Sequence, residues 1–189
     1  MSSPTRAPDR ESGFSLIEVC VAMLLIAIAL SAVAQLFVIS LAAQDDARVQ
    51  SMTTILANQK IEELRGLVWT IDQNGVPISD RSSDLSVSPA TAGGSGLNAS
   101  PVNSLDVNTP EYVDYLDGNG TWVGTGSSAP RNARYIRRWC IQPLPADPQD
   151  AVVLQVLVTT VTNDRHARTS RGRLPGDALV TTVRTRKAH

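Results

Sequence analysis

The stretch that decides the fold is Gly13-Phe14-Ser15-Leu16-Ile17-Glu18, which leads directly into an apolar run that ends at Leu41. From residue 19 to residue 41 the only clearly polar side chains are Ser31, Gln35 and Ser40. A helix over residues 14–41 would be about 42 Å long at roughly 1.5 Å per residue, enough to cross a hydrocarbon core of about 30 Å. A charged residue in such a span costs roughly 2.5–3.5 kcal/mol on insertion scales, so Glu18 needs a partner. The sequence therefore predicts a membrane-spanning helix that carries one functional acid near its start.

Two more ordinary interpretations of this segment are a secretory signal and a plain membrane anchor. A secretory signal has a positively charged start and about 7–15 apolar residues. Residues 1–12 instead carry two arginines and two acidic residues, and the apolar run is longer than such a signal. A plain single-pass anchor accounts for the hydrophobicity, but it does not account for a carboxylate beside a glycine-bounded start.

The six residues from Gly13 to Glu18, placed before an uninterrupted apolar helix, resemble the class III signal of type IV pilins and of the pseudopilins of type II secretion. In that family a prepilin peptidase cuts after the glycine and methylates the new N-terminus. The resemblance implies a leader over residues 1–13 that is removed, prepilin cleavage between Gly13 and Phe14, and N-methylation of Phe14. It also implies that Glu18 acts in subunit assembly by attracting the free α-amino group of a neighbouring subunit.

Beyond Leu41 apolar residues recur at spacings of three, four and seven, which is helical periodicity. These residues are Val49, Met52, Leu56, Ala57, Ile61, Leu64, Leu67 and Val68. The sequence therefore predicts one long helix over residues 14–69, whose second half carries an apolar stripe that a sheet must cover. A coiled coil is the alternative for this half, but the heptad pattern is too short to support it.

Residues 70–130 are rich in glycine, serine, asparagine and proline, which indicates a loop-rich, exposed segment. In pilins the corresponding segment is variable. Short strands are predicted at residues 111–116 and 121–123.

Asp114 and Asp117 lie near a glycine-rich turn, in the region where some pseudopilins bind calcium. Their spacing does not follow the helix–loop–helix calcium pattern, and Asp117-Gly-Asn-Gly120 is more typical of a hairpin turn, so we predict no metal and no other cofactor.

Residues 131–189 are predicted to form an antiparallel sheet. The three predicted strands are Arg134–Gln142, Ala151–Thr162 and Ala178–Arg186. The first and third alternate in polarity, and the second is β-branched at most positions. We expect Pro143 to end the first strand, residues 147–150 to form a turn, and residues 163–177 to form a polar loop. A sheet laid over the amphipathic half of the helix gives the α+β arrangement expected of a pilin.

The two cysteines, Cys20 and Cys140, are predicted to lie in the membrane helix and in the exported domain, so they should not bridge. Cys140 is either a buried strand residue or an unpaired thiol available to another chain. Many pilins close a C-terminal loop with a disulfide, and this chain cannot do so internally. That departure argues against a major pilin that carries adhesion.

Charge is distributed unevenly along the chain. Residues 66–130 contain seven acidic residues and one arginine, whereas residues 131–189 contain eleven basic residues and four acidic ones. Such a dipolar domain suits packing against other subunits, although solvated loops would give the same charge counts. The basic residues could instead contact nucleic acid, but no aromatic side chains for base stacking follow Trp139, so no nucleic-acid partner is favoured.

The two histidines, His166 and His189, lie in no catalytic motif, so an enzyme is not predicted.

A second, looser resemblance concerns function. Tyr135-Ile-Arg-Arg-Trp139, followed by Pro143-Leu-Pro145 and an apolar strand, resembles the C-terminal part of PilV-type minor pilins. It implies a minor pilin that helps to initiate or modify a type IV pilus. Its partners would be prepilin peptidase, other minor and major pilins and the inner membrane, with a pilus-tip adhesin as a further candidate. The chain would lie in the inner membrane with a periplasmic domain, and later in the pilus fibre.

Two alternatives remain. The first is a GspI-type minor pseudopilin of a type II secretion system, which shares the N-terminal signature and the approximate size. The second is a membrane-anchored periplasmic enzyme, which measurable turnover by the purified domain would support.

Overall fold

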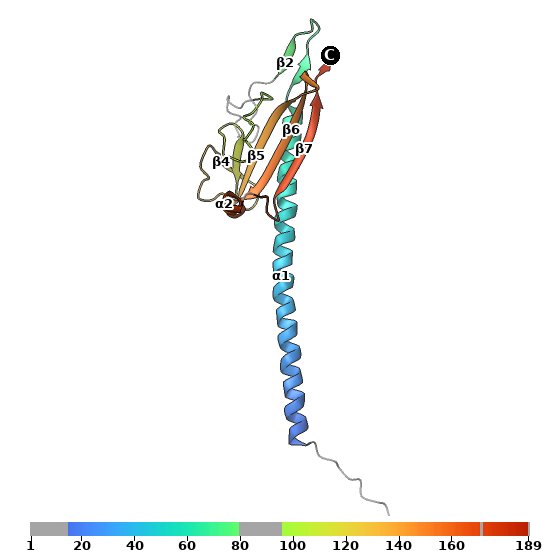
Figure 1. Cartoon of the computed structure of the whole chain (residues 1–189), viewed down its shortest axis with the longest axis vertical. Helices are drawn as coiled ribbons and strands as arrows, with labels where there is room; N and C mark the ends of the chain where they lie inside the picture. Colours follow the sequence, from blue (N-terminus) through green and yellow to red (C-terminus); the bar gives the residue numbers. More distant parts are fainter. Residues whose placement is uncertain (1–14, 80–95, 171, 189) are drawn as a thin grey trace, which may run out of the picture. The chain divides into compact units, whose positions relative to one another are not determined.

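A computed structural model describes residues 15–79, 96–170 and 172–188 of the chain (Figure 1). The chain divides into two units, Met1–Gln44 and Asp45–His189, which are described separately. In order along the chain the elements are α1 (Leu16–Gly66), β1 (Trp69–Ile71), β2 (Pro77–Ser79), β3 (Val113–Leu116), β4 (Trp122–Thr125), β5 (Tyr135–Leu144), β6 (Asp147–Thr160), α2 (Val161–Ser170), β7 (Ala178–Thr185) and β8 (Lys187–Ala188).

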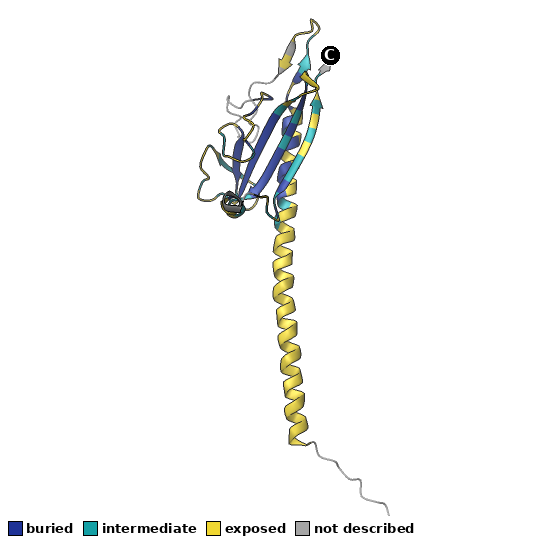
Figure 2. Ribbon diagram, in the orientation of Figure 1, coloured by how far each residue is buried: buried dark blue, intermediate teal, exposed yellow. Residues whose placement is uncertain are grey.

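The first unit contains the N-terminal part of α1. Every residue from Ser15 to Gln44 is exposed, and this stretch is yellow in Figure 2. Within the described residues, α1 is the one helix that is long and apolar enough to cross a membrane. The predicted first helical residue, Phe14, lies outside the described residues.

The second unit is built on a five-stranded antiparallel sheet with strand order β4-β3-β5-β6-β7. β5 and β6 form a long hairpin and carry most of the sheet core. A smaller sheet has the order β2-β1-β8, in which β8 runs parallel to β1. The chain therefore returns after β7 to the segment that follows α1.

Residues 45–66 of α1 cover one face of the large sheet, and their buried stripe is dark blue in Figure 2. The helix contributes Leu56, Ala57, Ile61 and Leu64 to the core. β5 and β6 contribute alternate residues, as strand geometry requires: Tyr135, Trp139, Ile141, Val152, Leu154, Val156 and Val158. The α+β arrangement predicted from the sequence is confirmed.

A smaller cluster occupies the opposite face of the sheet. Val113, Tyr115 and Ile136 are buried there, and Val161 at the start of α2 packs against them. The start of α2 thus lies on the face that α1 does not cover, whereas Leu97 and Tyr112 reach the core on the α1 side.

Several predicted boundaries are wrong, and each has a physical reason. The helix ends at Gly66 and not at residue 69, because Trp69 begins β1 and pairs with β2. β5 continues through Pro143 to Leu144, because a register shift at this point accommodates the proline. The expected turn at residues 147–150 is the start of β6.

The predicted polar loop at residues 163–177 is also partly wrong, because residues 161–170 form α2. β6 therefore ends at Thr160, two residues earlier than predicted. The Thr160 hydroxyl accepts a hydrogen bond from the backbone N–H of Asn163 at 3.0 Å, which is a typical helix N-cap. In addition, β3 and β4 lie close to the short strands predicted within residues 70–130, and they belong to the same sheet as β5.

Candidate assembly site

Glu18 lies in the first turn of α1. Its backbone N–H donates a hydrogen bond to the carbonyl of Ser15 at 3.0 Å, which begins the helix. A carboxylate in the first turn interacts favourably with the positive end of the helix dipole. Gly13 and Phe14 lie outside the described residues, so cleavage between them and N-methylation of Phe14 stay predictions.

A largely apolar surface extends along α1 on both sides of Glu18 in the sequence. Sixteen large apolar side chains are at least 50% exposed: Leu16, Ile17, Val19, Val21, Met23, Leu24, Leu25, Ile26, Ile28, Leu30, Val33, Leu36, Phe37, Val38, Ile39 and Leu41. The hydroxyl of Ser31 donates to the carbonyl of Ile28 at 2.8 Å, so this polar side chain needs no water. Such a surface requires lipid or other apolar helices around it.

Residues 8–34 match the family model of the prokaryotic N-terminal methylation motif. The matched stretch contains Gly13, Phe14, Glu18 and the first part of the apolar helix. It supports a type IV pilin-like protein, anchored in a membrane by α1, with a structural role. The long helix and the antiparallel sheet are consistent with the type IV pilin fold. No curated protein and no solved structure matches the chain.

The second unit contains an ion pair between two strands of the sheet, buried beneath α1. The guanidinium of Arg137 on β5 donates two hydrogen bonds to the carboxylate of Asp114 on β3, at 2.9 and 2.7 Å. The two residues lie directly opposite each other in the ladder, and neither is more than 1% exposed. A third nitrogen of Arg137 donates to the backbone carbonyl of Leu56 at 3.3 Å, so the pair also holds α1.

Lys60 of α1 completes this buried cluster. Its ammonium lies 3.8 Å from the Asp114 carboxylate and 3.2 Å from that of Glu63. It also lies 4.1 Å from the centre of the Trp139 ring, which is cation–π geometry. Lys60 was not predicted to be buried, because the predicted stripe contains apolar residues only. Lys60 lies three residues after Ala57 and four before Leu64, and this helical spacing places it on the buried stripe.

Arg138 makes the corresponding contacts on the opposite face of the sheet. Its guanidinium donates to the side-chain oxygen of Asn108 at 2.9 and 2.6 Å and to the carboxylate of Asp164 at 2.6 Å. Asp164 belongs to α2, so this arginine joins α2 and the loop before β3 to the sheet. The adjacent arginines in Tyr135–Trp139 therefore point to opposite faces, and each is buried against a carboxylate.

The two acidic residues that were considered as calcium ligands, Asp114 and Asp117, have other hydrogen-bond partners in the structure. Both carboxylate oxygens of Asp114 are engaged by Arg137. One oxygen of Asp117 accepts the backbone N–H groups of Asn119 and Thr121, at 2.8 and 2.9 Å. These bonds form the turn between β3 and β4, so the hairpin-turn interpretation is confirmed. Within the described ranges, no group of three or more histidine, cysteine, aspartate or glutamate side chains is placed to hold a metal.

Both cysteines are free. Cys140 is buried on β5, and its sulfur accepts hydrogen bonds from the hydroxyl of Ser100 at 3.3 Å and from the amide of Gln142 at 3.6 Å. The interpretation of Cys140 as a buried strand residue is confirmed.

Two arginines of the basic C-terminal segment contact the end of α1 and the strand β1 that follows it. Arg184 donates to the backbone carbonyls of Leu64 and Leu67, and the guanidinium of Arg186 lies 4.5 Å from the centre of the Trp69 ring. These side chains, which were considered for phosphate contacts, therefore have structural contacts within the domain.

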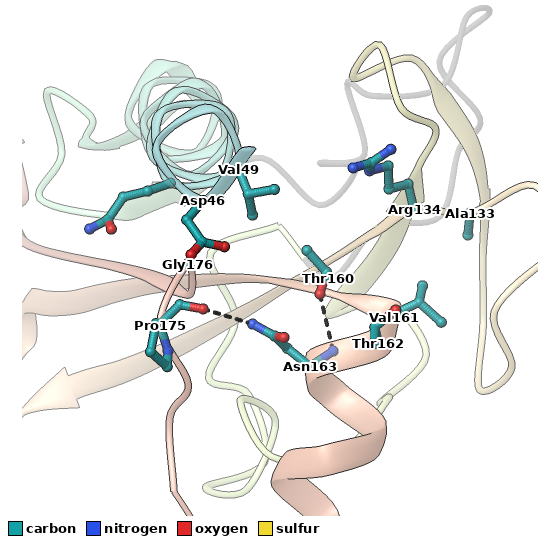
Figure 3. Close-up of a pocket in the computed structure, with 11 residues that line it drawn as sticks. Asp46, Val49, Ala133, Arg134, Thr160, Val161, Thr162, Asn163, Pro175 and Gly176 are labelled. Carbon is teal, nitrogen blue, oxygen red and sulfur yellow. Dashed lines mark hydrogen bonds between the residues drawn. The ribbon is translucent and has the colours of Figure 1, made fainter. Parts of the chain in front are cut away.

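A cavity of about 500 Å³ in the second unit lies between α1, the start of α2 and the loop before β7 (Figure 3). Asp46 and Val49 line it from α1, and Gly176 lines it from the loop. The side-chain amide of Asn163 donates to the carbonyl of Pro175 at 3.0 Å, so this lining group joins the loop to α2. The arrangement of these residues contributes to the fold and suggests no reaction.

Proposed function

We propose that the protein is a minor pilin that takes part in initiating or modifying a type IV pilus. One observation carries the proposal: Glu18 stands five residues after Gly13, at the start of an exposed apolar helix, within a match to the N-terminal methylation motif.

The proposed mechanism is assembly without catalysis by this chain. The prepilin inserts into the inner membrane through residues 14–41, with its sheet domain in the periplasm. Prepilin peptidase cuts after Gly13 and methylates the amino group of Phe14. The apolar side chains of α1 then leave the lipid when they pack against the helices of neighbouring pilins, which keeps them out of water.

Glu18 is the group that selects the register of this packing. A carboxylate buried alone in an apolar fibre core is strongly unfavourable. Placing it beside the N-terminal amine of a neighbouring subunit pairs the charge, and only one axial offset between the two helices achieves this. The proposal therefore assigns Glu18 a role in assembly and none in membrane insertion.

The finer assignment to PilV-type minor pilins rests on the resemblance of Tyr135–Trp139 and the following prolines. The contacts of the two central arginines support a structural use of this sequence, since Arg137 joins α1 to the sheet and Arg138 joins α2 to it.

Deletion of the gene, with and without complementation, tests the proposal. We expect the deletion strain to have fewer or shorter surface type IV pili, as counted by electron microscopy, with normal protein secretion. Normal pili together with a secretion defect would contradict the pilus role and support a minor pseudopilin of type II secretion.

A further inference from the structure

The two edges of the five-stranded sheet differ in how they are protected. Edge strands expose backbone N–H and C=O groups that can pair with another chain, and proteins usually protect them with short strands, bulges, proline or charged side chains. β4 has several of these features. It is four residues long, its pairing with β3 contains a register shift, and Pro130 lies 3.0 Å from the position of a Cβ on Gly124.

β7 is longer and has neither a bulge nor a proline, and its one charged side chain, Arg184, donates to the backbone carbonyls of Leu64 and Leu67. The strand has eight residues without glycine or proline, and its pairing with β6 is continuous from Ala178 to Thr185. Within the described parts of the chain, β6 is the only strand paired with it, so its other edge is open. Figure 1 shows β7 at the margin of the sheet.

The ladder identifies which backbone groups face outward. The N–H of Arg186 donates to the carbonyl of Asp150 on β6 at 2.7 Å. Hydrogen-bonded pairs alternate along an antiparallel ladder, so the even-numbered residues of β7 bond to β6. The N–H and C=O groups of Leu179, Thr181, Val183 and Thr185 therefore point away from the sheet. Thr181, Val183 and Thr185 are also exposed.

A groove of about 260 Å³ runs beside the C-terminal half of this edge. It is lined by Arg65, Trp69, Val183, Arg184 and Thr185. Two of these residues are arginines, and none of the described lining residues is acidic. The nearest acid on the same helix is Glu62, which lies 2.8 Å from Arg65, and both side chains are more than half exposed. Arg184 already donates to the backbone carbonyls of Leu64 and Leu67, so Arg65 is the cation through which the groove would attract a negatively charged segment.

We propose that β7 accepts an extended acidic segment of another protein as a sixth strand of the sheet. Backbone hydrogen bonds to the four odd-numbered residues would hold the segment, and a carboxylate would lie beside Arg65. β-Strand addition of this kind draws affinity from the backbone and specificity from alternate side chains. The proposal concerns the sheet edge and does not depend on the assembly role of Glu18.

The test uses the full chain in detergent micelles and an eight-residue peptide of alternating threonine and valine with one central glutamate. Amide hydrogen exchange is measured for β7 with and without the peptide. We expect the peptide to slow exchange at the odd-numbered residues selectively, because the even-numbered amides already bond to β6. A matched peptide with lysine in place of glutamate should bind more weakly.

Variants of Val183 separate backbone pairing from side-chain effects. Val183→Pro removes an N–H that points to the open edge and leaves the ladder with β6 intact, since proline is tolerated on such an edge. Val183→Thr keeps the N–H. We expect Val183→Pro to weaken peptide binding about tenfold, the effect of one lost hydrogen bond at the upper end of its usual range, and Val183→Thr to change it little.

A charge variant tests the groove. Arg65→Gln should reduce the preference for the glutamate peptide over the lysine peptide, whereas Arg131→Gln, at an exposed arginine that does not line the groove, should not. Equal binding of both peptides, or no selective protection of the odd-numbered amides, would overturn the proposal. A dimer of the full chain that Val183→Pro dissociates would overturn it too, because the occupant would then be a second copy.

Discussion

The adjacent residues Arg137 and Arg138 show how strand geometry distributes charge. Successive side chains of a strand point to opposite faces, so one guanidinium meets Asp114 beneath α1 and the other meets Asp164 of α2. Each pair is almost fully buried. Such pairs add little net stability over apolar residues of the same shape, but loss of one partner leaves a buried charge and is strongly destabilising. The two pairs therefore select one arrangement of the domain.

This gives a stability prediction for Arg137→Met. The substitution keeps the length of the side chain but leaves the Asp114 carboxylate with only Lys60, at 3.8 Å. We expect a loss of about 3 kcal/mol in the free energy of unfolding. Urea unfolding of the full chain in detergent measures it through tryptophan fluorescence, since all three tryptophans lie in the second unit.

Arg131→Met is the matched control, because Arg131 is exposed in the loop before β5. Its effect should lie within about 0.5 kcal/mol. Similar losses for the two variants would contradict the assigned role of the buried pair.

The second prediction at this scale concerns Glu18→Val. The substitution removes a charge from the apolar segment, so membrane insertion should remain intact. Incorporation into filaments should fall strongly, because the charge that selects the register is absent. Quantification of the subunit in membranes and in sheared fibres measures both. Gln35→Val, which also removes a polar group from this segment, should assemble normally, and wild-type incorporation of Glu18→Val would exclude the register role.

At the scale of elements, periodicity predicted α1 and the strands β5, β6 and β7 because each follows one repeat over many residues. It could not predict α2, which is polar and short. That helix is held by one tertiary contact, the bond from Arg138 to Asp164, together with the local cap by Thr160. Thr53 was likewise not predicted to be buried because it is polar, yet it is fully buried and its hydroxyl donates to the carbonyl of Gly176 at 2.8 Å.

Two glycines in the turn between β3 and β4, Gly118 and Gly120, should differ in how far substitution by alanine lowers the stability of the domain. Gly120 has φ +82°, and a Cβ there would lie 2.8 Å from Met52 and 3.0 Å from Leu56 of α1. Gly120→Ala should therefore destabilise the domain by about 2–3 kcal/mol through backbone strain and overpacking. Gly118→Ala meets only the Arg134 side chain at 3.5 Å, an ordinary contact.

Urea unfolding of both glycine variants measures the difference. A much smaller effect is expected for Gly118→Ala. Equal stability of the two variants would show that the turn does not pack on α1 as described.

At the scale of the whole molecule, the evidence for function is concentrated in a short part of the chain. Residues 8–34 carry the family match, whereas the fold of residues 45–189 rests on α1, the sheet and its buried pairs. The sequence predicted the apolar helix and a role for Glu18, because a carboxylate is rare within a membrane-spanning segment. It could not predict the partners of Arg137, Arg138 and Arg184, because each partner lies far away in the sequence and is brought near only by the sheet.

The measurement that most directly tests the central claim is the intact mass and N-terminal residue of the membrane-extracted protein, with and without prepilin peptidase. The account predicts loss of residues 1–13 and an N-methylated Phe14 only when the peptidase is present. An uncut chain, or cleavage at any other bond, would contradict the account and would leave α1 as a simple membrane anchor.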